Sequence, residues 1–275
     1  MTTASIVAYH TPQKYLKRLI DSVEQSEVSV LYVVDNSSND ELHDFLRDYP
    51  SIRYIYLGKN LGYGAAHNIA IKRAIELGSK YHVVLNPDVY WEGDVLGRLS
   101  DFMDKTPDCG LVMPKIVYPN GKTQYLCKLL PTPIDLIVRR FIPIKSYQKR
   151  LDYNYELQWC GYDKVMEVPS LSGCFMFMRC SVLKIVGGFD ERYFMYAEDL
   201  DLCRRIGEVS KTIFYPLVSV VHEYEKGSYK NKQLLKYHIK SVVKYFNKWG
   251  WFFDKKRTNK NKYCTSKAKS MKNEE

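Results

Sequence analysis

The stretch VVLNPDVYW, residues 83–91, is the part of the sequence from which the fold can be worked out. It is an apolar run that ends at a proline and places an asparagine and a carboxylate, Asn86 and Asp88, on either side of Pro87. Asn-Pro-Asp favours a turn, so a strand is predicted to end here. Whether the two polar side chains do more than form the turn depends on what surrounds them.

Three more runs of β-branched and aromatic residues come before this one. The four predicted strands are residues 4–9 (ASIVAY), 28–34 (VSVLYVV), 52–57 (IRYIYL) and 81–85 (YHVVL). The segments between them carry apolar residues at helical spacing, as in Tyr15, Leu19 and Val23. Strands that are apolar throughout and alternate with helices are typical of a parallel sheet covered on both faces. The sequence therefore predicts an α/β fold.

Polar residues follow each predicted strand. In parallel sheets ligands bind at the carboxyl ends of the strands, so these residues are expected to share one edge. They are Tyr9 and His10, then Asp35, Asn36 and Ser37, then Asn60, and finally Asn86 and Asp88.

The alternation of strands and helices fails between residues 114 and 169, which are rich in proline, tyrosine and basic residues. We interpret this stretch as an insertion, with a candidate helix through IDLIVRRFI at 134–142. Regular patterns return from residue 170, in SLSGCFMFMRC and in TIFYPLVSVVH.

The remaining motifs each allow two interpretations. Asp35 follows a buried strand, yet the same position suits a helix cap. Gly62 and Gly64 permit close approach of a ligand, or simply a tight turn, and they do not form G-x-G-x-x-G. His222 follows an apolar strand and is either a ligand or a hydrogen-bonded structural residue.

AEDLDLCRRI offers three neighbouring carboxylates, Glu198, Asp199 and Asp201. Side chains two residues apart diverge on a helix, so Asp199 and Asp201 cannot share a face and only one of them can point into a cleft. The alternative is an acidic first helical turn stabilised by the helix dipole.

Taken in order, these motifs resemble the inverting glycosyltransferase family 2, whose members have the GT-A fold and use nucleotide-sugar donors. The similarity is greatest to the rhamnosyltransferase-like branch of bacterial surface-polysaccharide biosynthesis. The matching segments are SIVAYHTP, VVDNSSND, NLGYGAAHN, LNPDV, SGCFMFMRCSVLKIVGGFDERYFMYAEDLDLCRR and the His222 that ends VSVVH. The resemblance implies a Rossmann-like, mostly parallel central sheet flanked by helices.

The resemblance also implies roles for individual residues. The catalytic residues implied are Asp199 and Glu198, of which Asp199, the second of the pair, falls on the general base. Asp88 and His222 fall on metal ligands. One departure is clear, because the first acid of the family's D-x-D motif is Asn86 here. Hard oxygen ligands indicate Mg²⁺ or Mn²⁺ as the cofactor. The donor-binding residues implied are Tyr9, Asp35, Gly62, Gly64, Asn68, Asn86 and Asp88.

The function implied is transfer of a sugar from a dTDP- or UDP-sugar, with dTDP-rhamnose as the first candidate, to a lipid-linked or saccharide acceptor. A divalent ion would stabilise the charge on the leaving diphosphate, and a base would take the proton of the attacking hydroxyl. Two alternatives stay open: a nucleotidyltransferase, and a non-catalytic module that binds a sugar nucleotide or a membrane.

The chain has 275 residues and a formal charge of +10, which is concentrated at its end. From Lys226 onward there are 15 Lys and Arg against three Asp and Glu, whereas residues 1–225 carry 26 against 28. The seven cysteines are scattered, without a C-x-x-C pair, and are expected to be reduced. No secretion signal is recognisable in the first twenty residues, so a cytoplasmic protein is expected.

We expect residues 1–225 to form the catalytic domain and 226–275 a basic amphipathic tail. Within the domain we expect a nucleotide-binding half at 1–113, the insertion at 114–169 and an acceptor-binding half at 170–225. In the tail, lysines recur every fourth residue, and a separate apolar stripe is formed by Leu235, Ile239, Val242, Phe246 and Trp249.

Such a helix, within 232–257, could lie on an anionic membrane at the inner face of the cell membrane, or pack its apolar stripe on the domain. Nucleic acid is not expected as a partner, because the domain is slightly acidic and has no recognition motif. The residues after Lys255 are expected to be disordered.

Overall fold

The structure, a computed structural model, describes residues 1–138, 144–223 and 232–273. The first four long strands are β1 (Thr2–Ala8), β2 (Val30–Asp35), β3 (Ile52–Tyr56) and β4 (Tyr81–Leu85). They pair side by side in the order β3-β2-β1-β4, and all three pairings are parallel. The four strands predicted from sequence are therefore confirmed, with shifts of one or two residues at their ends.

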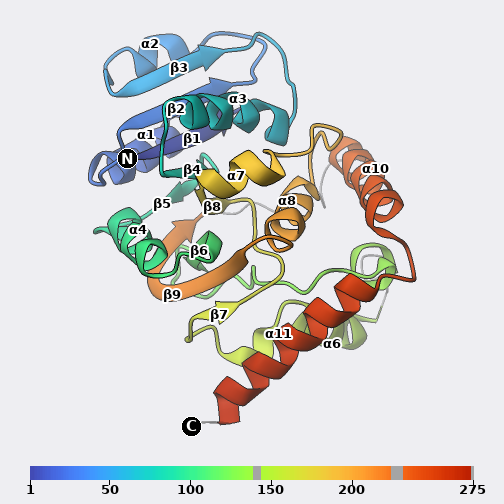
Figure 1. Cartoon of the computed structure of the whole chain (residues 1–275). Helices are drawn as coiled ribbons and strands as arrows, with labels where there is room; N and C mark the ends of the chain where they lie inside the picture. Colours follow the sequence, from blue (N-terminus) through green and yellow to red (C-terminus); the bar gives the residue numbers. More distant parts are fainter. Residues whose placement is uncertain (139–143, 224–231, 274–275) are drawn as a thin grey trace.

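The second half of the sheet mixes strand directions. It contains β5 (Val89–Tyr90), β6 (Cys109–Val117), β7 (Met166–Glu167), β8 (Phe175–Arg179) and β9 (Lys211–His222). β8 runs antiparallel to both β4 and β6, and β9 runs parallel to β6. β5 and β7 both pair antiparallel with β9. One mixed sheet thus joins the first 113 residues to the later ones (Figure 1).

Helices connect the strands and cover the sheet. In the first half they are α1 (Gln13–Glu24), α2 (Leu42–Leu46), α3 (Tyr63–Glu76) and α4 (Val95–Lys105). In the second half they are α7 (Cys180–Val186) and α8 (Glu198–Ile206). Figure 1 shows α3, α7 and α8 in front of the sheet. The core between these layers is apolar, and Ile6, Val33, Val84 and Phe177 are fully buried.

The predicted insertion contains short elements. They are the π-helical turn η1 (Ile134–Val138), α6 (Lys145–Tyr155), the 3₁₀ turn η2 (Gln158–Cys160) and strand β7. The helix predicted over 134–142 is confirmed in its first half by η1, and residues 139–143 lie outside the described part. β7 adds the end of this insertion to the edge of the sheet beside β9.

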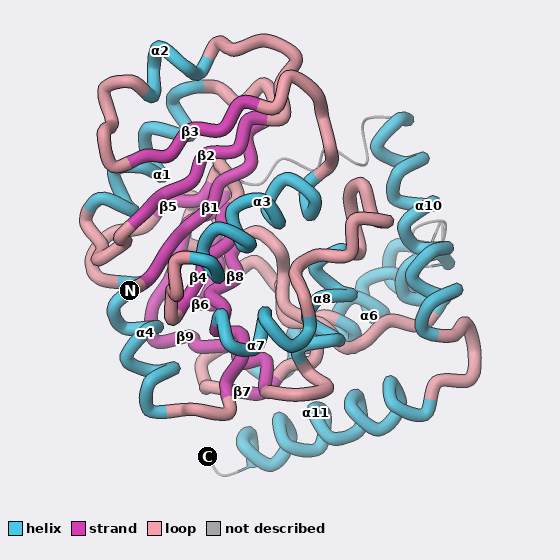
Figure 2. Tube along the Cα trace, turned by 45° about the horizontal axis from the view of Figure 1, so that its top comes forward, coloured by secondary structure: helices cyan, strands magenta, loops and turns pink. Residues whose placement is uncertain are grey.

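Helix α10 (Lys232–Trp249) packs on the domain. Its buried side chains Val242, Tyr245 and Phe246 contact a cluster that includes Leu130 and Leu200. The apolar stripe predicted for the tail is thus turned toward the protein in its second half, as one of the two interpretations required, whereas Ile239 in its first half is 47% exposed. Figure 2 shows α10 at the right-hand margin of the molecule, on the side of α8 away from the sheet.

The prediction of disorder after Lys255 is wrong, because helix α11 occupies Lys255–Asn273. Arg257, Cys264 and Ala268 are buried on one side of it. The Asn261 amide donates to the Leu130 carbonyl and accepts from its N–H, both at 2.8 Å. The buried face of α11 contains residues of mixed polarity. It therefore has no apolar periodicity by which the sequence would predict it.

Candidate active site

A cleft of about 910 Å³ opens at the carboxyl ends of the central strands. Its walls come from the turn after β4, the loop before β8, the first turn of α8, the end of β9 and the segment after β6. Several of the residues predicted from the sequence lie here, together with others that were not predicted. Those predicted are Asn86, Glu198, Asp199 and His222.

Asp88 and His222 meet because two strands pair. Val89 of β5 lies opposite His222 of β9, and the Glu223 N–H donates to the Asp88 carbonyl oxygen at 3.0 Å. The pairing brings His222 Nε2 to 3.4 Å from Asp88 Oδ1, and Asn86 Nδ2 lies 3.5 Å from the same nitrogen. The turn that opened the sequence analysis therefore presents both of its polar side chains to one histidine.

Asp199 sits at the start of α8 and is held from two sides. The Gly173 N–H donates to Asp199 Oδ2 at 2.9 Å, and the Leu200 N–H donates to Oδ1 at 2.8 Å. The two residues before the helix, Tyr196 and Ala197, have φ of 71° and 63°. The chain therefore turns sharply before α8 and brings its first turn to the cleft.

Glu198 is in a different state from its neighbour. It is buried, and its Oε2 has no hydrogen-bond partner among the described residues. Burial, followed by the nearby charge of Asp199, raises the pKa of Glu198 well above its ordinary value. The carboxyl of Glu198 is therefore held protonated.

Asp201 turns away from the cleft, as the helical spacing predicted. It is fully buried and accepts hydrogen bonds from Arg205 Nε and from the Trp249 indole, each at 2.8 Å. Lys248 Nζ lies 2.6 Å from Oδ1 of Asp201. Asp201 thus fastens α10 to α8, and this removes Lys248 from the lysine stripe predicted for the tail.

Tyr63 is a cleft residue that the sequence did not indicate. Its hydroxyl donates to the Gly173 carbonyl at 2.7 Å, and the N–H of the same glycine holds Asp199. Burial raises the pKa of Tyr63 well above its ordinary value, so the hydroxyl remains a donor. The only sequence signal was its place between Gly62 and Gly64, in a turn that was interpreted through its glycines.

The glycine-rich turn packs against the loop that precedes α8. A Cβ on Gly62 would lie 2.3 Å from the Phe194 carbonyl oxygen, and one on Gly64 would lie 2.7 Å from the Phe189 Cβ. Asn68 bonds Phe189 twice, accepting from its N–H at 2.8 Å and donating to its carbonyl at 2.9 Å. These contacts bind α3 to the loop that leads into Glu198 and Asp199.

Tyr9 and Asp35 lie at the same sheet edge, after β1 and β2. Asp35 is fully buried, and its carboxylate accepts from the Ser37 N–H and the Tyr54 hydroxyl, both at 2.9 Å. It borders a separate hollow of about 210 Å³ that Ser37 and His10 also line. The Tyr9 side chain is exposed, with its ring edge-on to His10.

The residues around Asp88 fit a divalent cation. Asp88 Oδ1 is buried without a hydrogen-bond partner among the described residues, yet it faces His222 Nε2. Although burial lowers the pKa of His222, Cys174 and Asp88 raise it to about 10, so a positive charge is favoured at this point. Within the described part of the chain, no group of three or more His, Cys, Asp or Glu side chains is arranged to hold a metal. Protein ligands alone would therefore leave most of the coordination shell to substrate and water.

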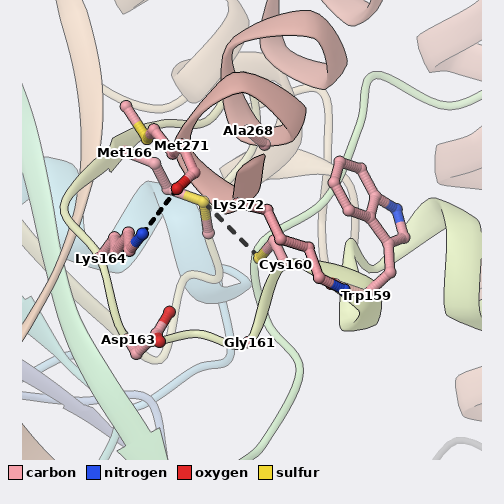
Figure 3. Close-up of a pocket in the computed structure, with 9 residues that line it drawn as sticks. All are labelled: Trp159, Cys160, Gly161, Asp163, Lys164, Met166, Ala268, Met271 and Lys272. Carbon is pink, nitrogen blue, oxygen red and sulfur yellow. Dashed lines mark hydrogen bonds between the residues drawn. The ribbon is translucent and has the colours of Figure 1, made fainter. Parts of the chain in front are cut away.

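A third hollow is separate from this cleft. It lies between the segment at η2 and helix α11, and no residue that lines it also lines the cleft (Figure 3). Lys164 Nζ donates to the Met271 carbonyl at 2.6 Å, and Cys160 Sγ lies 3.7 Å from Met166 Sδ. The bond from Lys164 holds α11 on the insertion.

The central sheet flanked by helices has the architecture of the GT-A fold. The sequence profile of Glycosyl transferase family 2 matches residues 3–185, about two thirds of the chain. The chain belongs to this family and is a glycosyltransferase. Glycosyl transfer is therefore favoured over the nucleotidyltransferase and the non-catalytic module, the two alternatives that the sequence left open.

Two relatives of this chain carry rhamnosyltransferase names. The chain is 29% identical to the N-acetylglucosaminyl-diphospho-decaprenol L-rhamnosyltransferase of Mycobacterium tuberculosis, over 79% of this chain and 74% of the relative. It is 25% identical to the rhamnosyltransferase WbbL of Escherichia coli K12, over 87% and 90% of the two chains. The predicted resemblance to the rhamnosyltransferase-like branch is confirmed.

A solved structure confirms the predicted fold. GalNAc-T7, in complex with UDP, GalNAc and Mn²⁺, superposes with a TM-score of 0.61 at 15% identity. The match covers 82% of this chain and 43% of the GalNAc-T7 chain. No helix in the described residues combines the length and the apolar character that crossing a membrane requires.

Proposed function

We propose that this glycosyltransferase moves a sugar, with rhamnose from dTDP-rhamnose as the first candidate, to a lipid-linked saccharide in surface-polysaccharide assembly. The observation that carries the proposal is that Asp199 and His222 line one cleft, and that Asp88 lies 3.4 Å from His222. The names of the two relatives support the sugar, and the mycobacterial relative's name supports a lipid-diphosphate acceptor.

In this proposal Asp199 is the general base. It accepts the proton of the acceptor hydroxyl as that oxygen bonds to the anomeric carbon, while the bond from this carbon to the diphosphate oxygen breaks. A single displacement of this kind inverts the anomeric centre. The hydrogen bonds from Gly173 and Leu200 fix the carboxylate before the substrates arrive.

Asp88 and His222 would hold a divalent cation, Mn²⁺ or Mg²⁺, with Asn86 beside them. When bound, that cation supplies positive charge to the leaving diphosphate. Mn²⁺ accompanies UDP in the GalNAc-T7 structure, which has the same fold. On the donor side we propose that Tyr9 and Asp35 contact the nucleoside, at the hollow bordered by Asp35.

Gly62, Gly64 and Asn68 then shape the donor site indirectly. Their contacts with Phe194 and Phe189 set the distance between α3 and the loop that leads to Asp199. A side chain larger than hydrogen at either glycine would push this loop away from α3.

The test is a transfer assay with the purified protein, a lipid-diphosphate saccharide acceptor and a panel of dTDP- and UDP-sugars. Transfer from at least one donor, its loss with EDTA and its return with Mn²⁺ or Mg²⁺ are expected. The product should have the anomeric configuration opposite to that of the donor. Retention of configuration, or full activity in EDTA, would refute the mechanism proposed here.

We also propose that the protein binds the inner face of the cell membrane through the turn between α10 and α11. Phe252 and Phe253 are 76% and 99% exposed, and the exposed Lys255 and Lys256 follow them. The Arg257 guanidinium donates to the Phe252 carbonyl at 3.1 Å, so the turn is held in shape. Exposed aromatic side chains beside lysines suit the interface of an anionic bilayer.

Vesicle co-sedimentation tests this surface. The protein should bind phosphatidylglycerol vesicles more strongly than phosphatidylcholine vesicles. The double variant F252S/F253S should lose at least about tenfold in affinity, since burying one phenylalanine is worth about 1.5–3 kcal/mol. Ile185→Ser, on α7, is the matched control because Ile185 is 71% exposed. Equal loss in the control, or none in the double variant, would place membrane contact elsewhere.

A further inference from the structure

Gln124 lies in the predicted insertion but reaches the centre of the cleft. The chain turns back after β6, and the Gln124 N–H donates to the Ile116 carbonyl at 2.9 Å. Because β6 and β9 are parallel neighbours, with Val117 opposite Val221, this return places Gln124 beside the end of β9. The side chain is only 3% exposed.

The amide of Gln124 makes three hydrogen bonds. Its Nε2 donates to the His222 carbonyl at 2.7 Å and, more weakly, to the Val117 carbonyl at 3.4 Å. Its Oε1 lies 3.0 Å from His222 Nδ1. Both ends of the amide are thus engaged, two of the bonds being to the same histidine.

These partners fix Nδ1 of His222 as a protonated nitrogen. Carbonyl oxygens can only accept, so the NH₂ group of Gln124 must face them, and Oε1 must face the imidazole. An amide oxygen also only accepts, so Nδ1 must be the donor. Nε2 is then the position that exchanges a proton for a metal ion.

Nε2 of His222 faces Asp88, the other residue proposed to hold the cation. It is 3.4 Å from Asp88 Oδ1, which is buried and lacks a hydrogen-bond partner among the described residues. Two ligands of one octahedral ion with bonds of about 2.1 Å lie about 3 Å apart, close to this separation. Hydrogen bonds to the far nitrogen of a ligating histidine set its orientation and basicity.

We infer that Gln124 is a positioning residue that holds His222 with Nε2 directed at the divalent cation. The inference rests on the metal dependence in the proposed function, and it gives the insertion at 114–169 a role in the active site. Gln124 does not touch the cation or the reacting atoms itself.

The first test measures Mn²⁺ affinity by electron paramagnetic resonance in the presence of dTDP. Gln124→Met should weaken Mn²⁺ binding by about 10- to 100-fold, the usual effect of removing such a partner. His222→Ala should weaken it at least as much, and Gln124→Met should add nothing in the His222→Ala background. Losses that add, or wild-type affinity in Gln124→Met, would overturn the inference.

Gln158→Met is the matched control, because the Gln158 amide donates to Glu156 at 2.9 Å and is bonded to neither Asp88 nor His222 in the structure. It should retain wild-type Mn²⁺ affinity. Near-ultraviolet circular dichroism of each variant checks that the fold is retained.

The second test needs neither metal nor activity. Long-range ¹H–¹⁵N NMR of the wild-type protein should show a protonated Nδ1 in His222, and Gln124→Met should change this signal. An unprotonated Nδ1 in the wild type would overturn the inference even if the metal proposal held. If the wild type binds no divalent ion, the metal proposal fails instead, and the NMR result still decides whether Gln124 orients His222.

Discussion

At the scale of the residue, the two adjacent carboxyl groups of α8 differ in their surroundings. Glu198 is buried and its raised pKa keeps it neutral, whereas the Asp199 side chain accepts two backbone N–H bonds. A carboxyl group that already carries a proton cannot accept another one. Of the two, Asp199 is therefore the residue placed to accept a proton from a substrate.

Amide substitutions should separate the two. Asp199→Asn should reduce kcat by about 10²–10⁴, the usual contribution of a general base, with donor affinity retained. Glu198→Gln replaces a neutral acid by a neutral group of the same shape, so kcat should change by only a few fold. Steady-state kinetics with nucleotide titrations checks both. Equal losses in the two variants would show that Glu198 exchanges a proton during the reaction.

Tyr63 acts on Asp199 indirectly, through Gly173. Tyr63→Phe removes the bond to the Gly173 carbonyl and leaves a buried acceptor unpaired, at a cost of about 1–3 kcal/mol. Since that glycine's N–H holds Asp199, kcat should fall while the KM for the donor stays near the wild-type value. A change confined to KM would indicate that Tyr63 contacts the donor instead.

At the scale of the element, charge and apolar spacing are the patterns from which the sequence predicts how α10 and α11 behave. For α10 these patterns predict the buried residues Val242 and Phe246 correctly. They fail for α11, because the buried face includes Arg257, whose guanidinium donates to the Pro131 carbonyl at 3.2 Å. Hydrogen bonds to distant backbone groups do not follow any local pattern.

Two arginine substitutions on α11 test its packing. Ala268 is buried whereas Ser266 is exposed, so Ala268→Arg should lower the free energy of unfolding by at least about 1–3 kcal/mol through overpacking. Ser266→Arg should stay within about 0.5 kcal/mol of the wild type. Urea denaturation followed by circular dichroism measures both. Equal effects would mean that α11 does not pack on the domain in solution.

At the scale of the whole molecule, a buried hydrogen-bonded chain joins β1, β4 and α3. His82 bonds Thr3 and Ser5, both at 2.9 Å, and Ser5 also bonds His67 at 2.8 Å. Burial lowers the pKa of His82 to about 3 and that of His67 well below its ordinary value. Both histidines are therefore neutral in the folded protein.

This chain makes stability depend on pH. In the unfolded chain a histidine has a pKa of about 6.5 and binds a proton below that pH, whereas in the folded protein it stays neutral until the pH is far lower. The free energy of unfolding therefore falls as the pH drops below about 6.5. For His82 the loss between pH 7.5 and 5.5 should be about 1.4 kcal/mol. His82→Gln should remove that part of the pH dependence, measured by urea denaturation at both pH values. An unchanged difference between the two pH values would show that His82 is already charged in the fold.

The sequence by itself determined the parallel strands β1 to β4, the family resemblance and the turn that presents Asn86 and Asp88. These follow from local periodicity and from short motifs, which neighbouring residues specify. Only the tertiary structure decided that His222 faces Asp88, that Gln124 orients His222 and that Tyr63 supports Asp199. These residues are far apart along the chain and are brought together by strand pairing and by buried hydrogen bonds, which no local pattern contains.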